Sequence, residues 1–311
     1  MGALVAGRYA VQERLAEGGM SRVYSAEDTQ TGERVAVKIL EPEQVLRPGG
    51  MDAFLREVAA ARAAPHPNIV RTITEGQRGD GRPYLVMELL DGETLGERLE
   101  RDRALTSAEA IEIGVQIADG LAAAHAAGVV HRDVKPDNVF LVGAKGAHHT
   151  AKLLDFGLAE IELGAAAITG GVAKGTTSTM APEQVLDDGV DGRTDVYGLG
   201  VVLFKCVTGQ LPFDGSDDVL VFAHQVLSPA PPASWIADGL LPGLDQVITA
   251  TLRKHPDNRY RAMDDLRSDL ARLVRVPRGD VTPPELVVDP DAYHPRTPHA
   301  VRAIEFLRAR L

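Results

Sequence analysis

The sequence is poor in the residues that build disulfide scaffolds and metal clusters. Cys206 is the single cysteine among 311 residues, which excludes an internal disulfide framework and a cysteine-rich zinc site. A protein of this kind fits a reducing setting, and we expect a cytoplasmic location.

Long apolar runs are also missing. No run of about eighteen or more apolar residues occurs, so we expect no membrane span in this chain. The N-terminus MGALVAGRYA does not have the pattern of a signal peptide. Any membrane anchor of a longer parent would lie outside the sequence.

An excess of basic residues is absent as well. The formal net charge is −11, which argues against a general binder of nucleic acid. The 44% hydrophobic and 25% charged residues are typical of a globular protein with a sizeable core. The length fits two domains or one large one.

Residues 8–90 are expected to form a small β-rich lobe. The stretch RVAVKIL alternates in the manner of a strand. The strand patterns cover Arg22 to Ala26, Arg34 to Leu40, Ile69 to Thr74 and Tyr84 to Leu89. Met51 to Ala64 is alanine-rich and stops at Pro65, which predicts the only long helix of this lobe.

Residues 91–275 are expected to form a larger helical lobe, joined to the first near Asp91-Gly92. The expected helices are Ser107 to Ala127, Thr194 to Thr208 and Asp264 to Val274, and the expected strands are Val139 to Val142 and Lys152 to Leu154. Residues 276–311 are expected to be a proline-rich extension with a short terminal helix in AVRAIEFLRARL. This extension could inhibit, dock or link.

The densest chemistry lies in HRDVKPDN, residues 131–138. A carboxylate, an ammonium and an amide gather there in Asp133, Lys135 and Asn138, a set that suits a polyphosphate and a hard cation. Asp155 then follows a short strand and begins DFG. Each stretch alone is a weak signal, but the pair is a strong one.

These motifs resemble the eukaryotic-type, bacterial-like Ser/Thr protein kinase family, and the resemblance covers roughly residues 8–275. It implies an α+β fold of two lobes and ATP with Mg²⁺ as cofactors. Asp133 resembles the catalytic aspartate, and Lys135 the lysine that steadies the γ-phosphate. Asn138 and Asp155 resemble the metal ligands.

The resemblance also assigns residues of the small lobe. Lys38 in VAVK resembles the lysine that contacts the phosphates, and Glu57 its ion-pair partner. Met87 looks like the gatekeeper, and Glu88 to Leu90 like the hinge that reads adenine. The nucleotide-binding set implied by the resemblance is Ala16, Gly18, Gly19, Ser21, Val23, Ala36, Lys38, Met87, Glu88, Leu90, Phe140, Asn138 and Asp155.

Later motifs favour a protein kinase over a small-molecule kinase. Ala181-Pro182-Glu183 closes an activation segment that starts at Asp155. Asp195 resembles the aspartate that braces the catalytic loop, and Arg259 the arginine that pairs with Glu183. Within the segment we expect autophosphorylation, with Thr169 as the first candidate acceptor.

We therefore expect a Ser/Thr protein kinase that acts on protein hydroxyls, without nucleic-acid partners. A homodimer could support phosphorylation in trans. The alternatives are a pseudokinase that binds ATP as a scaffold, or a small-molecule phosphotransferase. The physiological substrate and the activating signal are open.

Overall fold

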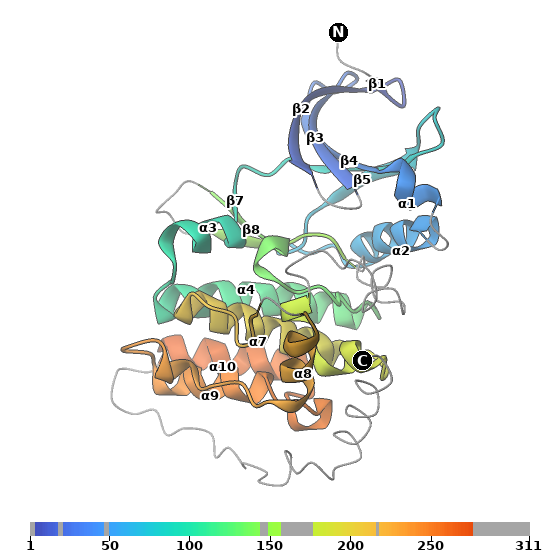
Figure 1. The fold of residues 1–311 in the computed structure, drawn as a ribbon. Coiled ribbons are helices and arrows are strands. Elements are labelled where there is room, and N and C mark those ends of the chain that lie inside the picture. Colours follow the sequence, from blue (N-terminus) through green and yellow to red (C-terminus); the bar gives the residue numbers. More distant parts are fainter. Residues whose placement is uncertain are drawn as a thin grey trace.

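The structure is a computed structural model that describes residues 4–17, 21–46, 50–143, 149–156, 177–215 and 218–275. The described residues form two lobes, a small one built on a curled sheet and a larger one made of helices (Figure 1). The fold is therefore α+β and bilobal, as the sequence predicts. Among the described residues, no helix is both long and apolar enough to cross a membrane.

The small lobe is built on a six-stranded antiparallel sheet with the order β1-β2-β3-β4-β6-β5. Its strands are β1 (Leu4–Val5), β2 (Tyr9–Glu17), β3 (Ser21–Asp28), β4 (Arg34–Leu40), β5 (Thr72–Gln77) and β6 (Pro83–Glu88). The central strand β4 is buried from Val35 onward, because one face carries a cluster around Val37 and Val86 and the other face is covered by a helix.

That covering helix is α2 (Gly50–Ala63), which follows the short α1 (Pro42–Leu46). Phe54 and Val58 of α2 are buried against Leu40 and Leu85 of the sheet. The spacing of four residues places both side chains on one face of the helix. The helix is thereby held beside β4, the strand that carries Lys38.

A three-stranded antiparallel sheet, β7-β8-β9, lies where the two lobes meet. It consists of β7 (Gly92–Thr94), β8 (Val139–Val142) and β9 (Thr150–Leu153). Gly92 has φ 152°, and a Cβ there would lie 2.0 Å from the Leu141 carbonyl oxygen. Only glycine fits this close approach, which brings the hinge against the strand that follows the HRDVKPDN loop.

The larger lobe is centred on α4 (Ser107–Ala126), which packs against α7 (Gly192–Thr208) and α10 (Met263–Arg275). Figure 1 shows these three helices stacked below the sheet lobe. The remaining helices are α3 (Leu95–Asp102), α6 (Pro182–Leu186), α8 (Asp218–Leu227) and α9 (Pro242–Thr251), with 3₁₀ turns η1 (Pro136–Asn138), η2 (Thr177–Thr179), η3 (Ala233–Trp235) and η4 (Pro256–Asn258). Capping boxes at Thr94 and Thr106 begin α3 and α4.

One strand begins at a later residue than we predicted. We predicted a strand over Ile69 to Thr74, but β5 begins at Thr72. Ile69 instead forms a parallel bridge with Leu153, and the Val70 amide donates to the Leu153 carbonyl at 3.0 Å. Residues 69–70 are therefore held by β9. Their strand-like sequence forms a contact between the lobes and does not extend β5. The predicted terminal helix lies outside the described residues.

Candidate active site

Residues 131–138 connect α4 to β8 and are held from below by one buried carboxylate. Asp195 of α7 accepts hydrogen bonds from the backbone amides of His131 and Arg132, both at 2.8 Å, and from His125 Nε2 at 2.7 Å. Arg132 has φ 68°, a left-handed conformation that costs a non-glycine residue on the order of 1 kcal/mol or more. Asp195 thus fixes the backbone of this loop, as the resemblance implies.

Helix α7 approaches the loop closely at Gly198. A Cβ there would lie 2.8 Å from the Val134 Cβ and 3.0 Å from its carbonyl oxygen. A larger residue would push the loop away from the helix. The glycine at this position of α7 therefore lets the loop that carries Asp133 lie against the helix.

Two polar side chains of the loop converge on one oxygen atom of Asp133. Asp133 Oδ2 accepts from Lys135 Nζ at 2.8 Å and from Asn138 Nδ2 at 2.8 Å. Asn138 Nδ2 also donates to the Asp133 backbone carbonyl at 2.9 Å. These bonds engage Asp133 Oδ2 and the Asn138 amide nitrogen.

His131 connects this loop to the segment that carries Asp155. Its Nε2 donates to the Leu154 carbonyl at 2.9 Å, and its Nδ1 accepts from the Asp133 amide at 3.3 Å. Its ring also packs on Phe156 with 4.5 Å between ring centroids. These contacts give His131 a structural place in the site.

Lys38 and Asp155 meet across the boundary between the lobes. Lys38 Nζ lies 2.7 Å from Asp155 Oδ1, and the lysine side chain is 1% exposed while the aspartate is 34% exposed. Asp155 has φ 51°, so its backbone is also held in the uncommon left-handed region. The side chain of Glu57, the predicted partner of Lys38, lies outside the described residues.

The donor set around Asp155 fits a hard divalent cation. The Leu154 amide donates to the Asn138 carbonyl at 2.9 Å, so the segments carrying Asn138 and Asp155 run side by side. Carboxylate and amide oxygens are the protein ligands that Mg²⁺ takes when substrate phosphates supply the rest. The described residues contain no group of three or more His, Cys, Asp or Glu that would hold a metal alone.

An apolar cluster adjoins Lys38 and Asp155. Ala36, Val70 and Met87 are buried together, with Val23, Leu89, Leu90 and Leu154 packed against them. Val23 pairs with Lys38, and Ala36 with Met87, in the registers of the sheet. The cluster therefore places an apolar surface, suited to a flat base, beside Lys38.

The other predicted nucleotide residues are spread around this surface. Ala16 pairs with Val23 near the end of β2, and Ser21 begins β3 with its side chain buried. Phe140 is half-buried in β8, and its ring lies against Gly92. Gly18 and Gly19 lie outside the described residues.

The Glu88 carboxylate is held by two donors. Its Oε1 accepts from the Arg71 amide and from Lys152 Nζ, both at 2.7 Å. The Glu88 side chain is thus engaged by β9 and by the residue before β5. The Glu88–Lys152 pair joins the hinge to β9.

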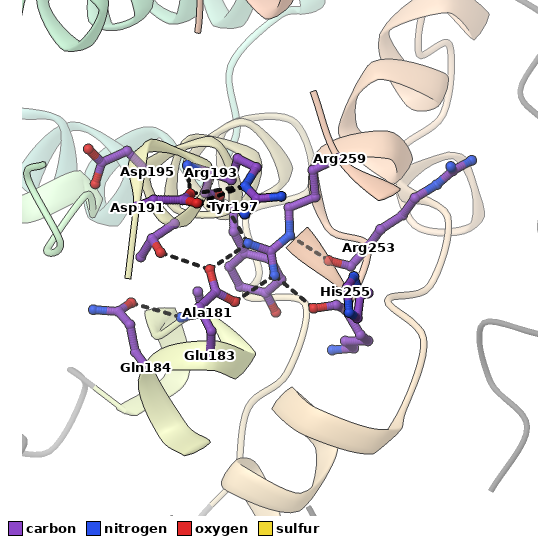
Figure 2. A network of polar contacts seen from close by, with 12 residues as sticks. Ala181, Glu183, Gln184, Asp191, Arg193, Asp195, Tyr197, Arg253, His255 and Arg259 are labelled. Atoms are coloured by element: carbon purple, nitrogen blue, oxygen red, sulfur yellow. Dashed lines mark hydrogen bonds and ion pairs between the residues drawn. The ribbon is translucent and has the colours of Figure 1, made fainter. Parts of the chain in front are cut away.

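The end of the activation segment is anchored by a buried ion pair (Figure 2). Arg259 Nη1 and Nη2 bind the two oxygens of Glu183 at 2.7 and 2.8 Å, and Thr194 Oγ1 donates to Glu183 Oε1 at 2.8 Å. The predicted Glu183–Arg259 pair is thus confirmed. Gln184 beside it donates to the Arg132 carbonyl at 2.8 Å, which links α6 to the HRDVKPDN loop.

Sequence reasoning missed Leu154, Lys152 and Gln184. Leu154 could have been found from its place directly before Asp155 on a short apolar strand. Lys152 and Gln184 gave no local signal, because their partners Glu88 and Arg132 lie 64 and 52 residues away in the chain. Thr169, the expected phosphate acceptor, lies outside the described residues.

Comparison with known proteins adds to this geometry. A family model described as the protein kinase domain matches residues 9–270. Serine/threonine-protein kinase Pkn1 of Myxococcus xanthus is 39% identical over 288 residues, which cover 91% of this chain and 41% of Pkn1. Serine/threonine-protein kinase PknB of Mycobacterium tuberculosis is 37% identical over 284 residues, which cover 89% of this chain and 44% of PknB.

A solved structure gives the same result for the fold. The crystal structure of the Mycobacterium tuberculosis PknI kinase domain superposes with a TM-score of 0.70 at 26% identity, covering 88% of this chain and 98% of that domain. By contrast, the chain spans about two fifths of the length of the curated relatives, 41% of Pkn1 and 44% of PknB.

Proposed function

The chain belongs to the protein kinase domain family, and from that premise we propose that it transfers the γ-phosphate of ATP to Ser and Thr hydroxyls of proteins. The observation that carries this proposal is the convergence of Lys135 and Asn138 on Asp133, at 2.8 Å each. That arrangement holds a carboxylate in place without using its second oxygen. The kinase domain of this proposal comprises residues 8–275, with lobes 8–90 and 91–275.

Asp133 is the proposed base and positioning group. Its Oδ2 is held by two donors, so Oδ1 can accept the proton of an acceptor hydroxyl. Lys135, bound to the same carboxylate, brings a positive charge to the phosphoryl group during transfer. Catalysis of this kind depends on positioning and on compensation of negative charge rather than on covalent chemistry.

We propose Mg²⁺ as the metal, held by Asn138 Oδ1 and the Asp155 carboxylate. Mg²⁺ held there would offset the negative charge of the phosphates. Lys38 would contact the phosphates, and Glu57 would fix Lys38. The apolar cluster of Val23, Ala36 and Met87 would hold adenine, with Phe140 and Leu90 at its edge.

Two further parts of the proposal concern regulation, and a third concerns the C-terminal extension. Autophosphorylation of the activation segment is supported by the presence of Arg132 beside Asp133, with Thr169 as the first acceptor to examine. Such a reaction in trans would need a homodimer, at least transiently. Residues 276–311 are proposed as an extension outside the kinase domain.

The test follows labelled phosphate from the γ-position of ATP with Mg²⁺ present. Three acceptors are offered separately: a generic basic protein, the chain itself and a panel of small hydroxyl metabolites. The proposal predicts phosphoserine and phosphothreonine in protein. ATP binding with no transfer would identify a pseudokinase, and labelling of metabolites alone would identify a small-molecule phosphotransferase.

A further inference from the structure

A buried glutamine connects helix α8 to the last part of the activation segment. Gln225 is fully buried, although it lies on a helix whose Leu220 is exposed. Its Nε2 donates to the Ser178 carbonyl at 2.6 Å, and its Oε1 accepts from the Tyr197 hydroxyl at 2.5 Å. The NH₂ group and the oxygen of the Gln225 amide therefore each have a hydrogen-bond partner.

The chemistry of these partners fixes the orientation of the amide. A carbonyl can only accept, so the NH₂ group must face Ser178, and the Tyr197 hydroxyl must then donate to the amide oxygen. Among the common side chains of this size, only an amide supplies one donor and one acceptor in this arrangement. Replacing it leaves a buried carbonyl or hydroxyl without a partner.

Gln225 closes a ring of contacts around residues 178–183. At the far end of this segment, Glu183 binds Arg259, and the Arg259 guanidinium lies 4.8 Å from the Tyr197 ring centroid (Figure 2). Tyr197 in turn binds Gln225, which binds Ser178 at the near end. The segment is thus held at both ends through one tyrosine.

Lys254 supports the same region of α8. Its Nζ donates to the His224 carbonyl at 3.2 Å and lies 3.9 Å above the Phe213 ring. The backbone carbonyl of Lys254 accepts from Arg259 Nη2 at 2.8 Å. Phe222 and Val226 of α8 also pack against Met180 and Val185 in an apolar cluster.

We infer that Gln225 is a positioning residue for the protein substrate: it fixes the backbone of residues 177–186, the segment that Gln184 joins to the loop carrying Asp133. This inference rests on the proposed kinase function and names a determinant of its protein-acceptor side. Gln225 touches neither the apolar cluster nor Lys38. Its loss therefore weakens the use of protein substrate and leaves ATP binding as it is.

The kinetic test compares Gln225→Met with Tyr197→Phe. Both remove the Tyr197–Gln225 hydrogen bond, but only Gln225→Met removes the contact with Ser178. We expect the KM for a basic protein substrate to rise about tenfold in Gln225→Met and less than about threefold in Tyr197→Phe, the size of one lost buried hydrogen bond. The dissociation constant for ATP stays within about twofold of wild type in both. Gln210→Met, at an exposed glutamine, is the surface control.

A general loss of stability would affect the two variants alike, so equal KM values would overturn the inference. A second measurement is independent of activity. Amide hydrogen exchange in residues 177–186 should speed up about tenfold in Gln225→Met while exchange in α7 stays unchanged, and unchanged exchange in 177–186 would also overturn it. If Gln225→Met does not fold, Gln225→Asn shortens the side chain by one methylene and faces the same two criteria. Absence of phosphotransfer in the wild type would refute the kinase proposal, while the exchange result would still decide the role of Gln225.

Discussion

Replacing Arg259 by methionine should destabilise the helical lobe strongly. A guanidinium has five N–H donors, and the five hydrogen bonds of Arg259 reach both oxygens of Glu183 and the carbonyls of Arg193, Arg253 and Lys254 (Figure 2). The arginine and glutamate side chains are 0% and 2% exposed. Methionine keeps much of the volume but leaves the Glu183 charge buried without its cation.

The expected magnitude follows from that burial. Removing one partner of a buried ion pair costs about 3–5 kcal/mol. In a domain of this size each kcal/mol lowers the melting temperature by roughly 2–4 °C, so a loss of about 4 kcal/mol corresponds to roughly 8–16 °C. Thermal unfolding followed by circular dichroism or calorimetry measures this change.

Arg193→Met is the matched control for this prediction. Arg193 binds Asp191 and Asp257 in the same network, but these carboxylates are 51% and 69% exposed, and exposed pairs contribute about 0–1 kcal/mol. The control should lose less than about 4 °C. A melting temperature for Arg259→Met within 2 °C of the control would refute the view that the buried pair anchors the lobe.

Three further predictions concern other parts of the molecule. Cys206 is buried, and burial raises the pKa of its thiol to about 12, so a thiol reagent at pH 8 should label it only as fast as the chain unfolds; rapid labelling of folded protein would show that α7 is open. The Arg8 guanidinium binds both oxygens of Asp28 at 2.7 and 2.6 Å and holds the pKa of that carboxyl well below its usual range. This stabilisation is present above the ordinary aspartate pKa of about 4 and is lost as pH falls towards the lowered value. The difference in melting temperature between wild type and Asp28→Asn should therefore be constant from about pH 5 to 8 and shrink below about pH 4, and a difference that grows on acidification would contradict the assignment. Lys38→Met should reduce phosphotransfer by about 100-fold or more, measured with saturating protein substrate, and activity near wild type would remove Lys38 from the site.

The sequence predicted those parts of the fold whose pattern is local. The alternation in RVAVKIL gave β4 with its observed bounds, and the alanine-rich stretch gave α2 to within one residue at each end. It did not predict α1 or α6, which have five residues each. Helices this short have little stability of their own, so tertiary packing decides whether they form.

The candidate site was likewise predictable from the sequence only in part. Asp133, Lys135 and Asn138 could be singled out because three chemically demanding side chains share one loop. Of the contacts that hold them, the one from Asp195 was expected only through the resemblance and the one from Gln184 was not expected, because both residues act on the backbone of that loop from more than fifty residues away. A backbone acceptor leaves no requirement on the side chain of its own residue, and so no local pattern marks it.

The most direct test of the proposed function is the Asp133→Asn variant measured in two assays. The asparagine keeps the shape but cannot accept the proton of the acceptor hydroxyl, so phosphate transfer to protein should fall by about 10²–10⁴-fold. ATP affinity, measured by calorimetry with Mg²⁺ present, should stay within about threefold of wild type, since Asp133 is not a proposed nucleotide ligand. Transfer at the wild-type rate with the same ATP affinity would contradict the role of Asp133 and the kinase chemistry built on it.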